Sequence, residues 1–170
     1  MDVTCQSGEV GDSWYVLLVV EDSLGELFVG GVLGQFREAE GGTYGASTAM
    51  GCRYLPDEEA QILAGFDTNT EQQQTLRDLA TKGLMTLAYE GPTEEQLSRA
   101  IENAKKNLPE QRITNSYWMS TLTENTERGV DYDAEYEAAV NNISAEGIKS
   151  VLQEIISQGN FKETVMFPQE

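Results

Sequence analysis

An arginine and a tyrosine that could act on the same substrate flank a diglycine in residues 37–45 (REAEGGTYG). This segment predicts a helix end, a turn at the glycines and the start of a strand, an arrangement that places Arg37 and Tyr44 near one another. A fixed guanidinium beside a phenol can clamp a carbonyl oxygen or stabilise an oxyanion. The alternative is an arginine that pairs with Glu38 or Glu40, and a tyrosine that is half buried in a strand.

Histidine is absent from the whole sequence, and this absence limits its chemistry more than any other feature of the composition. His-based metal sites, Ser-His-Asp triads and Cys-His dyads are thereby excluded. Residues 131–135 (DYDAE) space their carboxylates as a calcium loop does, but they lack its glycine and its distal bidentate glutamate, so a solvated helix start is the favoured interpretation. We therefore expect no catalytic residue and no metal site on this chain.

The composition is that of one acidic globular domain. The chain has 170 residues, of which 39% are hydrophobic, and this length fits a single domain over residues 1–170. Its 11 Lys and Arg stand against 29 Asp and Glu, and a net charge of −18 repels phosphate backbones, so no nucleic-acid partner is expected. The longest apolar run, residues 14–20, is too short to span a bilayer. The only cysteines, Cys5 and Cys52, form no disulfide framework and do not reveal the redox compartment.

The first part of the chain is open to two interpretations. Residues 13–40 carry apolar side chains on roughly one helical face, which favours a helix although several glycines interrupt it. Residues 15–20 (YVLLVV) fit a buried strand as well, because periodicity does not separate the two structures over so short a segment.

The remainder of the chain predicts a hairpin followed by helices. Residues 43–50 and 61–67 are expected to pair as antiparallel strands, with a turn at residues 55–57. Thr93 and Gln96 form a capping box that begins a helix. Further helices are predicted at residues 70–90, 113–122, 134–140 and 144–157, with a kink at Pro109 and a closing strand at residues 161–167. This order favours an α+β fold with an antiparallel-rich sheet that is covered on one face by helices.

An apolar stripe follows the predicted kink. Its members, Ile113, Tyr117, Trp118 and Leu122, recur at helical spacing. We interpret the stripe as part of the core, with a wall that contacts bound peptide as the alternative.

Four short segments carry a resemblance to a known family, and they occur in the order 37–45, 66–68 (FDT), 91–97 (GPTEEQL) and 114–118 (TNSYW). Together they resemble the last, C-terminal domain of the pitrilysin or insulinase family of zinc peptidases, whose catalytic domain carries an inverted His-x-x-Glu-His motif. The resemblance runs over most of the chain. It implies the α+β fold of that family, without one or more opening strands, because the sequence begins close to the family's first helix.

The resemblance also implies roles for the two residues at the diglycine. In this family, homologous domains occur in pairs that enclose a peptide chamber, with zinc on one half and an Arg and a Tyr of the other half near the active site. It therefore assigns substrate binding to Arg37 and Tyr44, which would hold a substrate carbonyl and stabilise the oxyanion formed when zinc-activated hydroxide attacks. The implied partners are a peptide substrate and a zinc-bearing N-terminal half, since no cofactor is expected on this chain.

The expected function is that of a non-catalytic, substrate-binding domain of a zinc metalloendopeptidase, inactive alone. A catalytically silent assembly or protein-interaction subunit is the alternative, since the family includes such members. The motifs are most similar to bacterial members, many of them exported or envelope-associated, which makes the periplasm or cell envelope one candidate location. Residues 1–4 lack the basic region of a signal peptide.

Overall fold

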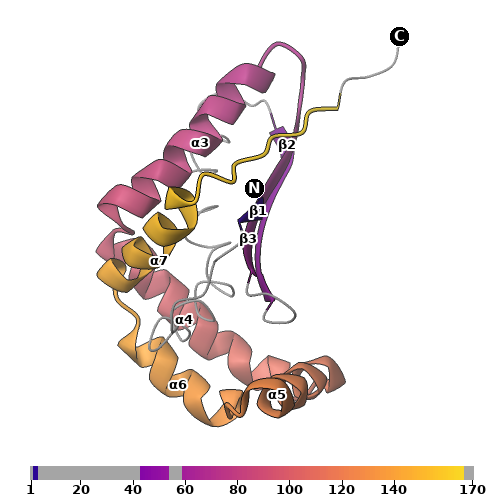
Figure 1. Cartoon of the computed structure of the whole chain (residues 1–170), viewed down its shortest axis with the longest axis vertical. Coiled ribbons are helices and arrows are strands. Elements are labelled where there is room, and N and C mark those ends of the chain that lie inside the picture. Colours follow the sequence, from indigo (N-terminus) through magenta and orange to yellow (C-terminus); the bar gives the residue numbers. More distant parts are fainter. Residues whose placement is uncertain (1, 4–42, 54–58, 167–170) are drawn as a thin grey trace.

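The computed structural model describes residues 2–3, 43–53 and 59–166, which form a small antiparallel sheet and a set of helices on one of its faces (Figure 1). The strand order is β1-β3-β2. Only two of these strands are long. The strands are β1 (Asp2–Val3), β2 (Thr43–Arg53) and β3 (Glu59–Thr68).

The hairpin of β2 and β3 has one buried and one exposed face. Met50 lies opposite Ile62 in the antiparallel ladder, and both side chains are buried. Their neighbours in the ladder, Ala49 and Leu63, are exposed on the other face. This alternation follows from the two-residue period of a strand, which sends successive side chains to opposite faces of the sheet.

Local signals in the sequence set the ends of the helices. Thr93 accepts a hydrogen bond from the backbone N–H of Gln96, whose side chain accepts from the backbone of Thr93, so the predicted capping box is confirmed. Ser144 caps the last helix by accepting a hydrogen bond from the backbone N–H of Gly147. The helices are α3 (Gln73–Glu90), α4 (Glu94–Gln111), α5 (Asn115–Arg128), α6 (Tyr132–Asn142) and α7 (Ala145–Ser157).

The core is centred where α3 and α7 pack side by side over the sheet (Figure 1), and it continues into α4 and α6. Leu76 of α3 and Leu152 of α7 are fully buried there, as is Ile148. Burying an aliphatic side chain of this size contributes about 1.5–3 kcal/mol. The side-chain amide of Gln153 also donates to the carbonyl oxygen of Ala88 at 2.9 Å, which fixes α7 along α3.

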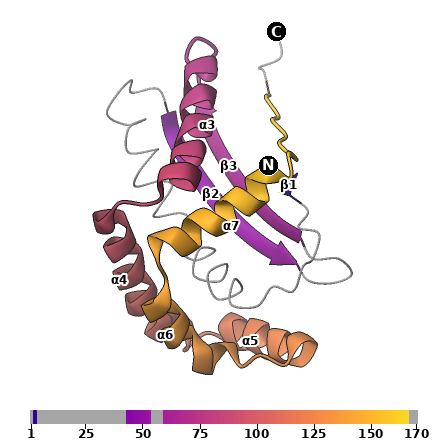
Figure 2. The same cartoon turned by 60° about the vertical axis from the view of Figure 1, so that its left-hand side comes forward.

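The other three helices extend away from the sheet. Figure 2 shows α4, α5 and α6 beyond the ends of α3 and α7, and we call this group the three-helix arm. Pro109 lies in the last turn of α4, which ends at Gln111 instead of continuing with a kink. The left-handed backbone at Gly129, with φ of 71°, ends α5, which continues beyond the predicted range of residues 113–122. No described helix is long and apolar enough to cross a membrane.

Three expectations need correction. The description of the sheet as antiparallel-rich overstated it, because the described structure is mostly helical and its sheet is essentially the β2–β3 hairpin. Residues 161–166 of the expected closing strand join no ladder with the described strands, and residue 167 lies outside the described residues. The stripe assigned to the core is mostly exposed: Ile113, Trp118 and Leu122 face solvent, and only Tyr117 packs against the core. Periodicity defines an apolar face but not what covers it.

Other expectations fall outside the described residues. They are the helix at residues 13–40, its alternative as a strand at residues 15–20, and the turn at residues 55–57.

Two leucine substitutions distinguish a core position from an exposed position on the arm. Leu152→Ala removes a side chain that is 0% exposed and is expected to lower the free energy of unfolding by about 3 kcal/mol. Leu122→Ala removes the same atoms from a side chain that is 61% exposed and should change it by less than about 0.5 kcal/mol. Urea unfolding followed by circular dichroism measures both, and equal losses would contradict this assignment of the core.

Candidate functional site

A β-bulge marks the start of β2. Thr43 pairs with Thr68 and Ala46 pairs with Phe66, so that Tyr44 and Gly45 together lie opposite the single residue Asp67. A bulge of this kind bends the strand and turns a side chain away from its regular direction, and such bulges are over-represented next to active sites. The backbone of Tyr44 thus occupies an irregular position at one end of the hairpin.

The structure describes only half of the predicted clamp. Arg37 lies outside the described residues, and of Tyr44 only the backbone is described. The expected approach of the guanidinium to the phenol therefore stays a prediction.

A cavity of about 550 Å³ lies beside the same end of the hairpin. We call it the β3 cavity, and it is enclosed by β3, α3 and residues 161–166. Ile62, Phe66 and Leu84 give it apolar walls. Thr68 also lines it, and its buried Oγ1 atom has no hydrogen-bond partner among the described residues. A cavity of this size and mixed lining lies within the range of ligand-binding sites.

An ion pair forms the outer wall of the β3 cavity. Arg77 of α3 donates from Nε and Nη2 to the two carboxylate oxygens of Glu163, which attaches residues 161–166 to the helix. The hydrogen bond to Glu163 raises the pKa of Arg77. Both side chains are about one-third exposed, so the pair contributes only modestly to stability. Its main effect is to hold residues 161–166 against α3.

The described residues offer no group that could hold a metal ion at the β3 cavity. A zinc site would need several His, Cys, Asp or Glu side chains around one point, and no such group occurs among the described residues. Together with the absence of histidine from the sequence, the donor set of this chain does not fit the zinc site of a peptidase.

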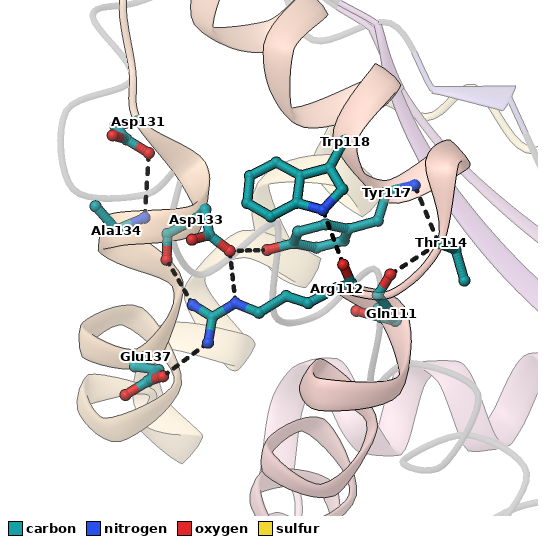
Figure 3. A network of polar contacts seen from close by, with 9 residues as sticks. All are labelled: Gln111, Arg112, Thr114, Tyr117, Trp118, Asp131, Asp133, Ala134 and Glu137. Carbon is teal, nitrogen blue, oxygen red and sulfur yellow. Dashed lines mark hydrogen bonds and ion pairs between the residues drawn. The ribbon is translucent and has the colours of Figure 1, made fainter.

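A second cluster of polar groups ties the three-helix arm together, as Figure 3 shows. Arg112, at the end of α4, donates from Nε to Asp133 Oδ1 of α6 at 2.7 Å and from Nη1 to Glu137 Oε1 at 3.3 Å. The hydroxyl of Tyr117 in α5 donates to the same oxygen of Asp133 at 2.6 Å. One carboxylate therefore joins three helices.

The TNSYW motif supplies the α5 side of this network. Thr114 caps α5 by accepting from the backbone N–H of Tyr117. The indole N–H of Trp118 donates to the carbonyl oxygen of Arg112 at 2.8 Å, and its ring meets that of Tyr117 edge to face. The motif thus fixes the angle between α4 and α5.

The network perturbs the titration of its members. Hydrogen bonds from Arg112 and Tyr117 hold the pKa of Asp133 below its ordinary value. Partial burial, with the hydrogen bond to Asp133, raises the pKa of Tyr117 to about 12. The charged carboxylate and the neutral phenol are therefore the favoured forms over a wide pH range.

Sequence reasoning found some of these residues and missed others. The helix start at residues 131–135 is confirmed, since Asp131 accepts from the backbone N–H of Ala134. The role of Asp133 in joining helices was missed, as were Arg112 and Arg77. Their partners lie far away in the sequence, and no local sequence pattern predicts such contacts.

The fold is shared with solved bacterial structures. The periplasmic protease PqqL from Escherichia coli matches with a TM-score of 0.67 and 16% identity, over 92% of this chain and 17% of that one. An inactive domain of an M16 peptidase from Pseudomonas fluorescens matches with a TM-score of 0.68 and 15% identity, over 90% of this chain and 36% of that one. A protease from Helicobacter pylori matches with a TM-score of 0.66 and 12% identity, over 92% and 38%.

These comparisons give the fold: the chain has the architecture of a domain found in M16 peptidases. It spans between 17% and 38% of the length of these three proteins. No family model and no curated protein matches the sequence.

Tyr117→Phe tests the network through pH. At neutral pH the loss of a partly exposed hydrogen bond to a carboxylate should lower the free energy of unfolding by about 1 kcal/mol. Because the pKa of Tyr117 is raised to about 12 in the folded state, this stabilisation is present below about pH 10 and is lost as the pH rises towards 12. The difference between wild type and variant, measured by urea unfolding, should shrink in that window.

The matched control is Tyr89→Phe, at a ring that is 61% exposed on α3. It should leave stability unchanged at neutral pH. A Tyr117→Phe variant as stable as wild type at neutral pH would show that the network does not hold the arm.

Proposed function

We propose that this chain is a non-catalytic, substrate-binding domain of an M16-type zinc metallopeptidase. In this proposal it closes one side of a peptide chamber and stabilises the oxyanion, while a partner domain carries the zinc. The observation that carries the proposal is a peptidase-domain fold in a sequence without histidine. In this proposal the domain serves peptide cleavage by binding.

The two residues at the diglycine supply the binding chemistry. Arg37 would hold the substrate carbonyl through its charge, and the phenol of Tyr44 would donate a hydrogen bond to the oxygen as negative charge develops on it. The bulge at Tyr44 and Gly45 supports this role, because it gives Tyr44 a position outside the regular ladder. Donors fixed by a folded domain need no reorganisation when the oxyanion forms.

The face of the hairpin that points away from α3 and α7 is a surface that can line a chamber. On this face Ser47, Ala49 and Leu63 are exposed and uncharged, and Asp67 is exposed and charged. Extended peptide can approach this face closely at Ser47, Ala49 and Gly65, where the side chains are small. Enclosure between this face and a partner would fix the substrate's conformation and exclude water.

Zinc belongs to the partner in this proposal, since the donor set of this chain does not fit it. The partner domain would supply the metal, its ligands and the base, and this chain would supply Arg37, Tyr44 and a chamber wall. The fractional coverage of the solved peptidase structures supports a larger functional unit.

Exposed apolar side chains on the three-helix arm support a second candidate function. Ile113 is 85% exposed and Met119 is 67% exposed, on and beside α5. Exposed apolar side chains in one region favour a contact with another protein. A catalytically silent assembly subunit would use this surface and would not need Arg37 or Tyr44.

The test is substitution of the two clamp residues in the assembled peptidase. Arg37→Ala and Tyr44→Phe should each lower the turnover of a fluorogenic peptide by about a hundredfold, mostly in kcat, because each removes a donor to the oxyanion. Circular dichroism should show unchanged folding.

Tyr89→Phe serves as the control at an exposed tyrosine of the same domain and should leave cleavage unchanged. Wild-type cleavage rates in both clamp variants would remove the oxyanion role and leave the assembly function.

A further inference from the structure

One stripe of α3 runs along the β3 cavity and changes from polar to apolar along its length. Gln73, Arg77, Ala80 and Leu84 line the cavity, and their spacing of three or four residues places them on one face of the helix. Arg77 is about one-third exposed, whereas Leu84 is buried. On the α3 side, the cavity therefore has a charged mouth and an apolar interior.

The strand side of the cavity shows the same change. Ile62 lies within β3 and is buried, and Phe66 packs against the core. Thr68 is the last residue of β3, and its buried Oγ1 atom has no hydrogen-bond partner among the described residues. A buried hydroxyl without a partner is uncommon, and a ligand with a polar group would satisfy it.

The charged mouth already holds a carboxylate. Arg77 donates to both oxygens of Glu163, which is the bidentate arrangement in which a guanidinium group binds a carboxylate. Glu163 belongs to residues 161–166, which run beside the sheet (Figure 1) and join no ladder with the described strands. Because a partly exposed ion pair contributes little to stability, a carboxylate from another molecule can replace Glu163 at Arg77.

The charge of the chain restricts the ligand further. A net charge of −18 opposes an anion at long range. At physiological ionic strength, charges more than about 8 Å apart are largely screened, so the direct contact with Arg77 dominates. The remaining repulsion favours a single carboxylate over a head group with more negative charge.

We propose that the β3 cavity binds a small amphiphile that has one carboxylate and an aliphatic chain. The carboxylate takes the place of Glu163 at Arg77, and the chain lies in the cavity towards Ile62 and Leu84. Arg77 and Leu84 are separated by about 10 Å along the helix, a distance that the extended chain of octanoate can span. Binding detaches residues 161–166 from α3.

This site goes beyond the proposed function. It uses neither Arg37 nor Tyr44, and it takes a small molecule instead of a scissile peptide. Its test measures binding and not cleavage, so failure of this proposal and failure of the clamp are distinguishable.

The first experiment is isothermal titration calorimetry of the whole chain with sodium octanoate at neutral pH and physiological salt. We expect saturable binding with a Kd between about 0.1 and 1 mM, which suits a ligand of this size. Acetate carries the head group without the chain, and octanol carries the chain without the carboxylate. Each should bind at least about tenfold more weakly than octanoate.

Substitutions of the two partners of the ion pair should have opposite effects. Arg77→Gln removes the cation and should weaken octanoate binding by at least about tenfold. Glu163→Gln removes the competing carboxylate and should strengthen binding by about threefold. Arg99→Gln is the matched control and should leave binding unchanged, because Arg99 pairs with Glu95 on α4 and does not line the cavity.

Release of residues 161–166 is measured with trypsin, which cleaves after lysine and arginine, and mass spectrometry locates each cut. Saturating octanoate should speed cleavage after Lys162 in the wild type. It should have little effect on that cut in Glu163→Gln, where the ion pair is already broken.

The proposal is overturned by any of four results. They are no binding of octanoate at about 10 mM, as when another part of the chain fills the cavity; equal binding of octanol; a change of affinity in the same direction in Arg77→Gln and Glu163→Gln, as a purely structural ion pair would give; and trypsin cleavage after Lys162 that octanoate does not change.

Discussion

The described structure depends on the burial of one face of the β2–β3 hairpin beneath α3 and α7. A two-stranded hairpin is marginal in water, and it becomes stable when its apolar face packs against helices. Met50 and Ile62 supply that face, and Leu152 and Ile148 meet it from α7 through the shared core. The bulge and the β3 cavity both lie on this supported hairpin, and both take their positions from it.

Different interactions dominate at the two ends of the described structure. At the sheet, packing is apolar and continuous, and it leaves a cavity at one edge. In the three-helix arm, a single carboxylate, Asp133, receives hydrogen bonds from Arg112 and Tyr117 and holds the helices at fixed angles. Charge-assisted bonds of this kind have strict geometry, so they can orient the arm, while α4 and α6 also bury Leu108 and Val140 in the shared core.

The sequence predicted the features that depend on local chemistry. The capping box at Thr93 and the cap at Ser144 follow from the hydrogen bonds that free helix amides need, and the hairpin follows from alternating residues between turns. The exposed stripe at Ile113 and Leu122 could not be predicted, because helical spacing describes a face but not its neighbour. The pairing of Arg77 with Glu163 joins residues far apart in the chain, and the sequence of neither segment predicts it.

For the clamp, the sequence predicted Tyr44 at the start of a strand, which the structure confirms. Arg37 lies outside the described residues.

The measurement that tests the central proposal most directly is peptide cleavage by this chain alone and by this chain mixed with the zinc-bearing half that the proposal assigns to its partner. A fluorogenic peptide library with added zinc serves as substrate. If the domain binds substrate without catalysing its cleavage, the chain alone should cleave no peptide. The mixture should cleave peptide faster than the zinc-bearing half does by itself. Cleavage by the chain alone would contradict the claim that it lacks a catalytic centre, and a mixture no more active than the zinc-bearing half would contradict its role in the chamber.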